Sequence, residues 1–157
     1  MGEVLKAAAE HKGSCFTEIY QNCPVFNDGA FSALTDKDVK DANQICLQAG
    51  EHVRFGVDGE RGVAMGSDGQ LRIVDVAEVG EDALLVHDEH HKASSLAFAL
   101  SRIAHTPNGP TPFGVFRDIE RPVYDELMAE QIATAKEKRG EGDLRELLLA
   151  GDTWTIS

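Results

Sequence analysis

The chain has 157 residues, and its 27 acidic and 15 basic residues give it a formal net charge of −12. This length suits one domain with a single core, since domains commonly span about 100–200 residues. The negative charge argues against nucleic acid or an anionic membrane as a partner, and no apolar run reaches the roughly 18 residues that a membrane span needs.

The first predicted elements are a helix over residues 3–12 and a strand over residues 15–20. The helix contains strong helix formers and stops at Gly13. No strand precedes it, so it looks like a helix from the middle of a β-α-β crossover. The strand mixes Cys, Phe, Thr, Ile and Tyr without polar alternation, which is typical of a strand covered on both faces. Glu18 would then need a polar partner.

A run of short strands is predicted for the middle of the chain. The clearest signal is Gly66-Ser67-Asp68-Gly69, whose glycines and Asp-Gly pair favour a tight hairpin turn. Alternating or β-rich segments on both sides of this turn predict a small antiparallel layer. The predicted strands are residues 43–48, 52–55, 61–65, 70–76 and 83–86.

The last third is predicted to hold helices and one loop. Residues 94–103 form a helix with a serine near its start. Residues 105–114 contain three prolines and two glycines, so we expect a loop that crosses the surface. A longer helix runs from Pro122 to about Lys138, and Asp143 caps a last helix over residues 144–150. The residues available for burial in the first of these helices are Leu96, Phe98, Ala99, Leu100 and Ile103.

The most informative stretch is residues 16–31, Phe-Thr-Glu-Ile-Tyr-Gln-Asn-Cys-Pro-Val-Phe-Asn-Asp-Gly-Ala-Phe. It delivers Cys23 from a predicted strand to a proline-stiffened turn, and α/β proteins build their sites at such strand ends. By spacing alone a single cysteine is more often a small buried hydrophobe. We expect Cys15 and Cys46, which lie inside predicted strands, to be core residues.

This stretch resembles the β subunit of 2-oxoacid:ferredoxin oxidoreductases, especially the 2-oxoglutarate synthase type, whose strand ends in a similar Glu-Ile-Tyr-Gln-Asn-Cys. The resemblance continues through residues 109–124 to the Gly-Asp-Thr-Trp ending. It implies that Cys23 is a ligand of a [4Fe-4S] cluster. It also implies that Asn27 and Asp28 lie near the cofactor end of the sheet, as cofactor-binding residues. The alternative is that Asn-Asp-Gly here only makes a turn.

Two motifs of that family do not occur in this sequence. One is the Gly-Asp-Gly-Asp segment that holds the magnesium and diphosphate of thiamine diphosphate, and the other is an early Cys-x-x-Cys pair. Three cysteines cannot complete a four-thiolate cluster. We therefore expect the C-terminal part of such a subunit, with residues 1–31 ending the thiamine-diphosphate-binding domain and residues 32–157 forming a C-terminal extension.

The expected fold class is α/β: an incomplete thiamine-diphosphate-binding-type unit with a helix and a parallel strand, then antiparallel hairpins and C-terminal helices. The resemblance implies that the full enzyme converts a 2-oxoacid, coenzyme A and oxidised ferredoxin to an acyl-CoA, carbon dioxide and reduced ferredoxin. Thiamine diphosphate, magnesium and [4Fe-4S] would be its cofactors, with none held by this chain alone, which would be inactive. The implied partners are the N-terminal half of the β subunit, the α subunit and ferredoxin.

Two other functions stay open at this point. The first is an acidic interaction module without catalysis. The second is a small metal-binding protein that uses His87, His90 and His91 in the segment His-Asp-Glu-His-His. The spacing differs from the His-Glu-x-x-His order of metalloproteases, and His87 and His91 would share a face only on a helix.

The compartment follows from the cysteines and the N-terminus. An odd number of widely spaced cysteines does not make a disulfide framework and fits a reducing environment. Residues 1–10 lack the long apolar stretch and the cleavage site of a signal peptide. We expect a cytoplasmic protein.

Overall fold

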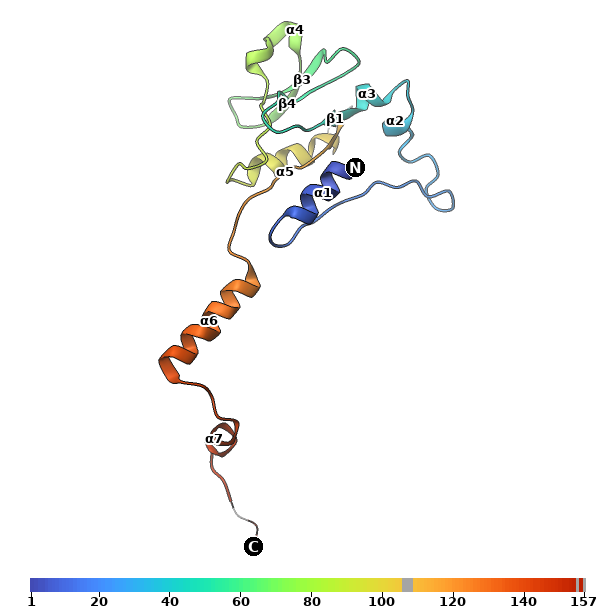
Figure 1. Ribbon diagram of the computed structural model, residues 1–157. Helices are drawn as coiled ribbons and strands as arrows, with labels where there is room; N and C mark the ends of the chain where they lie inside the picture. The colour runs from blue at the N-terminus through green and yellow to red at the C-terminus, as the bar shows by residue number, and fades with distance from the viewer. Residues whose placement is uncertain (106–108, 155, 157) are drawn as a thin grey trace. The chain divides into compact units, whose positions relative to one another are not determined.

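Two units make up the chain, Met1–Glu120 and Arg121–Ser157. The structure is a computed structural model and describes residues 1–105, 109–154 and 156. No helix among these residues is long and apolar enough to cross a bilayer. Figure 1 shows the elements of both units.

A three-stranded antiparallel sheet lies at the centre of the first unit. Its order is β2-β3-β4, formed by Arg54–Phe55, Arg61–Met65 and Leu71–Asp75. The β3–β4 hairpin turns at residues 66–69, as predicted, and Val63 lies opposite Ile73. Gly69 takes a φ of 76°, a left-handed conformation that glycine adopts without a steric cost. The local turn signal was therefore sufficient to place this hairpin.

A second, two-stranded sheet pairs β1 (Gln44–Cys46) with β5 (Thr111–Phe113) in parallel. The prediction of a surface loop over residues 105–114 is wrong, because β5 lies inside this range and Pro110 and Pro112 are buried; residues 106–108 of that loop lie outside the described residues. Pro112 is tolerated because β5 has a single neighbour, and an edge strand can leave one side of its backbone unbonded.

Residues 84–86 run beside β3 and residues 52–53 without forming a full strand. The predicted strand over 83–86 is reduced to two isolated bridges, which join Leu84 to Ala64 and Val86 to His52. A short 3-10 helix, η1 (Glu81–Ala83), occupies the start of the predicted range. The backbone still bonds on both sides, since Leu85 donates to Val63 at 2.7 Å and accepts from Val53 at 2.8 Å.

The hydrophobic core joins the strands to α5 (Ser95–Ser101) and η2 (Ile103–His105). The predicted burial of Phe98 is wrong, since its side chain is 64% exposed. Leu96, Leu100 and Ile103 follow a helical spacing along one face, and Phe98 falls on the opposite side of that helix. The buried residues that form the core cluster are Ile45, Leu47, Val53, Phe55, Val63, Leu100 and Ile103.

Four short helices complete the first unit. The predicted N-terminal helix is confirmed as α1 (Gly2–Glu10). Two of the others precede β1, and the last follows β4, where Asp75 caps it by accepting a hydrogen bond from the Ala77 backbone at 2.9 Å. They are α2 (Ser32–Thr35), α3 (Lys40–Asn43) and α4 (Val76–Val79).

The second unit consists of α6 (Tyr124–Arg139) and α7 (Leu144–Leu149), both as predicted. The predicted cap of α7 is confirmed, because Asp143 Oδ1 accepts from the Glu146 backbone at 2.9 Å. Neither helix has a buried residue. The apolar side chains of this unit therefore have no core of their own.

The mixed α/β class, with a short parallel pair, an antiparallel sheet and C-terminal helices, is confirmed. The boundary between residues 31 and 32 concerns a larger subunit and stays a prediction. Within this chain the contacts divide after Glu120.

Candidate functional site

An extended segment carries the chain from α1 to the candidate site. Residues 14–22 have no regular secondary structure, and all of them are exposed. Figure 1 shows this segment leaving α1 and running outward to a loop before the chain returns to α2. The predicted strand over 15–20 is thus wrong for this chain. A strand needs a neighbour for its backbone groups, and no described strand lies beside this segment.

Tyr20 fixes the far end of the extended segment to the rest of the unit. Its ring stacks on Phe31 at a centroid distance of 4.9 Å and meets the edge of Phe113 in β5 at 5.9 Å. Such aromatic pairs contribute about 0.5–1.5 kcal/mol each beyond the area that they bury. These ring contacts therefore hold the two ends of the following loop, at Tyr20 and Phe31, although the tip of the loop projects into solvent.

The loop begins at Cys23, and a backbone contact between Cys23 and Asn27 closes it. The Asn27 backbone N–H donates to the Cys23 carbonyl at 2.9 Å, and the two residues form an isolated antiparallel bridge. Pro24, Val25 and Phe26 make the tip between them, with Phe26 90% exposed. The predicted proline turn is confirmed.

The Cys23 sulfur sits among backbone donors. Hydrogen bonds from the backbone N–H groups of Phe26 and then Val25 lower the pKa of the Cys23 thiol. Burial opposes this, and a weaker contribution from the Asn27 N–H adds to the lowering. Its side chain is only partly covered. A thiolate that accepts backbone hydrogen bonds at an open position is suited to bind a metal ion or cluster.

The other two cysteines differ from the prediction. Cys15 and Cys46 are both exposed, so their assignment to the core is wrong. Cys15 lies in the unpaired segment, where its thiol donates to the Ala8 carbonyl at 3.2 Å. In β1 the inward position belongs to Ile45, and the alternation of a strand turns Cys46 to the other face.

Asn27 and Asp28 lie in the turn with Asn22, a residue that was not predicted to take part in the site. Asn22 donates through Nδ2 to Asp28 Oδ1 at 3.0 Å and accepts through Oδ1 from the Gly29 backbone at 2.9 Å. Asp28 thus has a structural partner in the turn. A role of Asn27 and Asp28 in cofactor binding stays a prediction. Asn22 could have been found from its polar side chain just before a turn, a position where Asn commonly bonds nearby backbone.

The histidine segment 87–91 does not gather its imidazoles. His87 is buried and bonds through Nε2 to the Val115 carbonyl at 2.7 Å, whereas its buried Nδ1 has no hydrogen-bond partner in the part of the chain that the structure describes. His90 bonds through Nδ1 to the Asp118 carbonyl at 2.6 Å, and His91 to the Ala93 carbonyl at 3.2 Å. Among the described residues, no group of three His, Cys, Asp or Glu side chains could hold a metal ion. The geometry gives the histidine-metal hypothesis no support.

Asp118 links the two ends of the first unit through contacts that no local sequence pattern predicts. Its Oδ1 lies 2.7 Å from Nδ1 of His11, just after α1, and its carbonyl accepts from His90. The Asp118 backbone N–H also donates to the Glu89 carbonyl at 2.7 Å. These contacts join α1 to the histidine segment and hold the start of the extended segment.

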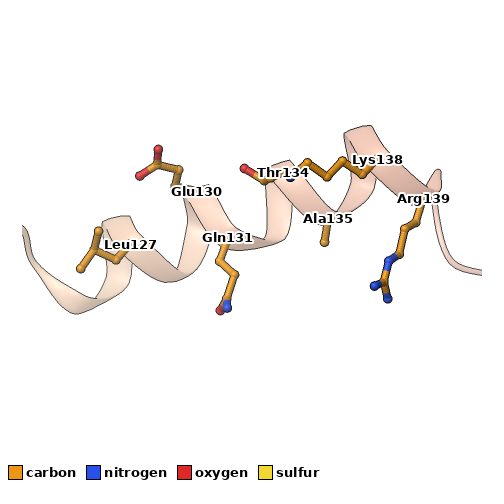
Figure 2. A pocket seen from close by; sticks show the side chains of 7 residues that line it. All are labelled: Leu127, Glu130, Gln131, Thr134, Ala135, Lys138 and Arg139. Atoms are coloured by element: carbon orange, nitrogen blue, oxygen red, sulfur yellow. The ribbon is translucent and has the colours of Figure 1, made fainter.

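A shallow hollow runs along α6 in the second unit. Every side chain that lines it comes from this one helix, and Figure 2 shows the seven of them spreading around it. A single helix does not surround a small ligand, so the hollow has none of the enclosure typical of ligand pockets. Its lining residues are Leu127, Glu130, Gln131, Thr134, Ala135, Lys138 and Arg139.

Comparison with known proteins gives one clear relationship. No family model matches the chain, and no solved structure matches it. Over 156 residues, however, it is 40% identical to the 2-oxoglutarate oxidoreductase subunit KorB of Mycobacterium tuberculosis. The chain is homologous to KorB. This alignment takes in 98% of the chain, so the resemblance first seen in residues 16–31 is confirmed along nearly its whole length.

The coverage of KorB itself is smaller. The chain spans 41% of the length of that relative. The likeness therefore concerns part of a 2-oxoglutarate oxidoreductase subunit. The activity of a whole 2-oxoglutarate oxidoreductase is therefore only a proposal for this chain.

Proposed function

We propose that this chain forms the part of a 2-oxoglutarate:ferredoxin oxidoreductase β subunit that supplies one cysteine ligand to an iron–sulfur cluster. The observation that carries the proposal is the 40% identity to KorB over 98% of the chain. The turn geometry supports it, since Cys23 presents a partly open sulfur that accepts backbone hydrogen bonds.

The residues present fit one corner of such a cluster. Cys23 offers a thiolate at a turn, which is the ligand type that [4Fe-4S] clusters require. Cys15 and Cys46 lie in other parts of the first unit, and three cysteines in all cannot supply four thiolates. The remaining ligands must come from another portion of the assembly, as must the groups that bind thiamine diphosphate and magnesium.

When bound, thiamine diphosphate supplies the carbon nucleophile for decarboxylation of the oxoacid, and the cluster accepts electrons one at a time. The share of this chain is to position one sulfur and to keep backbone donors around it. We assign the substrates of the whole assembly as 2-oxoglutarate, coenzyme A and ferredoxin. The compartment is the cytoplasm.

The extended segment 14–22 supports an assembly with further protein. Phe16 is 92% exposed, and the backbone of its neighbours lacks a strand partner among the described residues. We assign this segment as a strand that pairs with the remaining portion of the β subunit. Pairing would cover the apolar side chains and satisfy the backbone groups at once.

The exposed helices α6 and α7 support contact with a further surface. Leu144, Leu147 and Leu148 project from α7 with most of their area open to solvent. Apolar side chains in this arrangement stabilise a helix only when another surface covers them. We assign the covering surface to the other portions of the oxidoreductase, which are the N-terminal part of the β subunit and the α subunit.

The test is the iron and sulfide content of the assembled complex. The chain is co-expressed with the N-terminal portion of a KorB-type subunit and with the α subunit, carrying either the native residue or Cys23→Ser. We expect the Cys23→Ser complex to lose most of its [4Fe-4S] signal, while Cys15→Ser and Cys46→Ser complexes keep theirs. Unchanged cluster content in the Cys23→Ser complex would refute the ligand assignment.

A further inference from the structure

The neck of the Cys23 loop is closed by side chains as well as by backbone. Asn22 and Asp28 lie immediately outside the Cys23–Asn27 bridge, one on each side of the loop. Their side chains meet at 3.0 Å, and Asn22 also accepts from the Gly29 backbone at 2.9 Å. We call these two side-chain hydrogen bonds the Asn22–Asp28 clasp.

The tip of the loop has little else to hold it. Val25 and Phe26 are both largely exposed, so hydrophobic packing does not fix their backbone. Pro24 restricts one φ angle. The remaining restraints are the Asn27-to-Cys23 backbone hydrogen bond and the clasp. The direction in which the Val25 and Phe26 N–H groups point therefore depends on the neck staying closed.

We propose that Asn22 and Asp28 are positioning residues whose clasp keeps the backbone N–H groups of Val25 and Phe26 directed at the Cys23 sulfur and thereby raises the reduction potential of the cluster. The second half of this statement rests on the proposed function. The first half concerns the chain alone. Hydrogen bonds to cluster sulfurs stabilise the more negative, reduced state, so their loss lowers the potential.

The first experiment measures the clasp in the full chain without a cluster. Amide proton exchange of Gly29 and Asn27 is followed by NMR in the native chain, in Asn22→Ala and in Gln21→Ala. Losing one hydrogen bond of ordinary strength accelerates exchange by about three- to tenfold. We expect this for both amides in Asn22→Ala and no change in Gln21→Ala, whose side chain is the neighbour outside the clasp. Equal rates in all three chains would overturn the proposal.

The second experiment measures the cluster in the assembled complex. A redox titration followed by electron paramagnetic resonance compares the native chain with Asp28→Ala and with Asp28→Asn, which keeps an oxygen acceptor for Asn22. Both variants remove the carboxylate charge, so the comparison between them isolates the hydrogen bond, and we expect a lower midpoint potential in Asp28→Ala than in Asp28→Asn. Equal potentials in the two variants would overturn the proposal.

The two failures can be told apart. If Cys23→Ser leaves the cluster content unchanged, the proposed function fails, and the exchange experiment still decides whether the clasp exists. If Cys23→Ser removes the cluster but Asp28→Ala and Asp28→Asn give equal potentials, the function stands and the positioning role is wrong.

Discussion

The three-stranded sheet and the segment that carries Cys23 contain similar residues in different surroundings. Val63, in the middle of β3, is fully buried between two neighbouring strands, whereas Phe16 in the extended segment is almost fully exposed. Both regions contain β-branched residues and phenylalanine. The difference is that the strands of the sheet pair with one another within residues 54–75, whereas residues 14–22 pair with no described strand. The chain thus holds one self-sufficient core and a site that projects from it.

The largest expected effect is on the free energy of unfolding, and it compares a core residue with a residue in an exposed helix. Leu100 is fully buried in α5, and Leu100→Ala should lower the free energy of unfolding by about 2–5 kcal/mol, because it leaves a cavity. Leu148, which is 71% exposed in α7, is the matched control, and Leu148→Ala should change the free energy of unfolding by less than about 0.5 kcal/mol. Urea denaturation of the isolated chain measures both. A comparable loss in the two variants would mean that α7 is part of the same core.

A smaller effect tests the parallel β1–β5 pair. Gly114 follows β5 with a φ of 137°, and a Cβ built there would lie 2.8 Å from the Leu47 carbonyl oxygen. Gly114→Ala should therefore cost about 1–3 kcal/mol from backbone strain and crowding. Gly142, whose added Cβ meets nothing within 4 Å, is the control, and Gly142→Ala should be close to neutral. Thermal unfolding compares the two, and a neutral Gly114→Ala would contradict the tight approach of the chain here.

These two regions also show what the sequence could predict. The hairpin at residues 66–69 and the cap at Asp143 follow from a few adjacent residues, so local patterns were sufficient for both. Residues 15–20 were predicted to form a strand and do not, and residues 111–113 were predicted to lie in a loop and form β5. Both predictions failed for the same reason, because a strand depends on a partner far away in the chain. β5 pairs with β1, which lies more than 60 residues earlier, and no local signal announces that pairing.

The candidate site was predictable to the same extent. Pro24 and Asn27-Asp28-Gly29 announce a turn at Cys23, and the turn is there. The clasp from Asn22 and the contact of Tyr20 with Phe113 were not predicted, because they depend on how the loop returns and on where β5 lies. Local chemistry therefore predicted the loop, and long-range packing set its position.

Helix capping gives the third effect, and it compares two helices whose caps were both predicted. Asp143 accepts from the Glu146 backbone, whereas Ser94 makes no side-chain cap bond to α5. Asp143→Ala should destabilise α7 by about 0.5–2 kcal/mol, seen as faster amide exchange at Glu146 and Leu147. Ser94→Ala should leave exchange in α5 unchanged. Equal effects in the two helices would mean that Asp143 contributes through something other than its cap bond.

The smallest expected effect is a pH dependence at the histidine segment. The Asp118 carbonyl, which accepts from His90 Nδ1, raises the pKa of His90. Burial opposes this rise, and the nearby carboxylates of Glu89, Asp118 and Asp88 add to it. A raised pKa means that the folded chain favours the protonated imidazole. The stabilisation is then fully present below the unfolded-state pKa of about 6.5 and is lost as the pH rises through the higher folded-state value.

An NMR titration of the His90 ring protons should therefore give a midpoint above that of an unfolded peptide of the same sequence. His90→Asn keeps a donor for the Asp118 carbonyl but does not titrate, so the difference in stability between the two chains should narrow across the same pH window. A midpoint at or below the peptide value would show that the Asp118 contact does not form in solution. The contact between the histidine segment and the end of the first unit would then belong with the loosely held regions of the chain, beside the Cys23 loop, and not with its core.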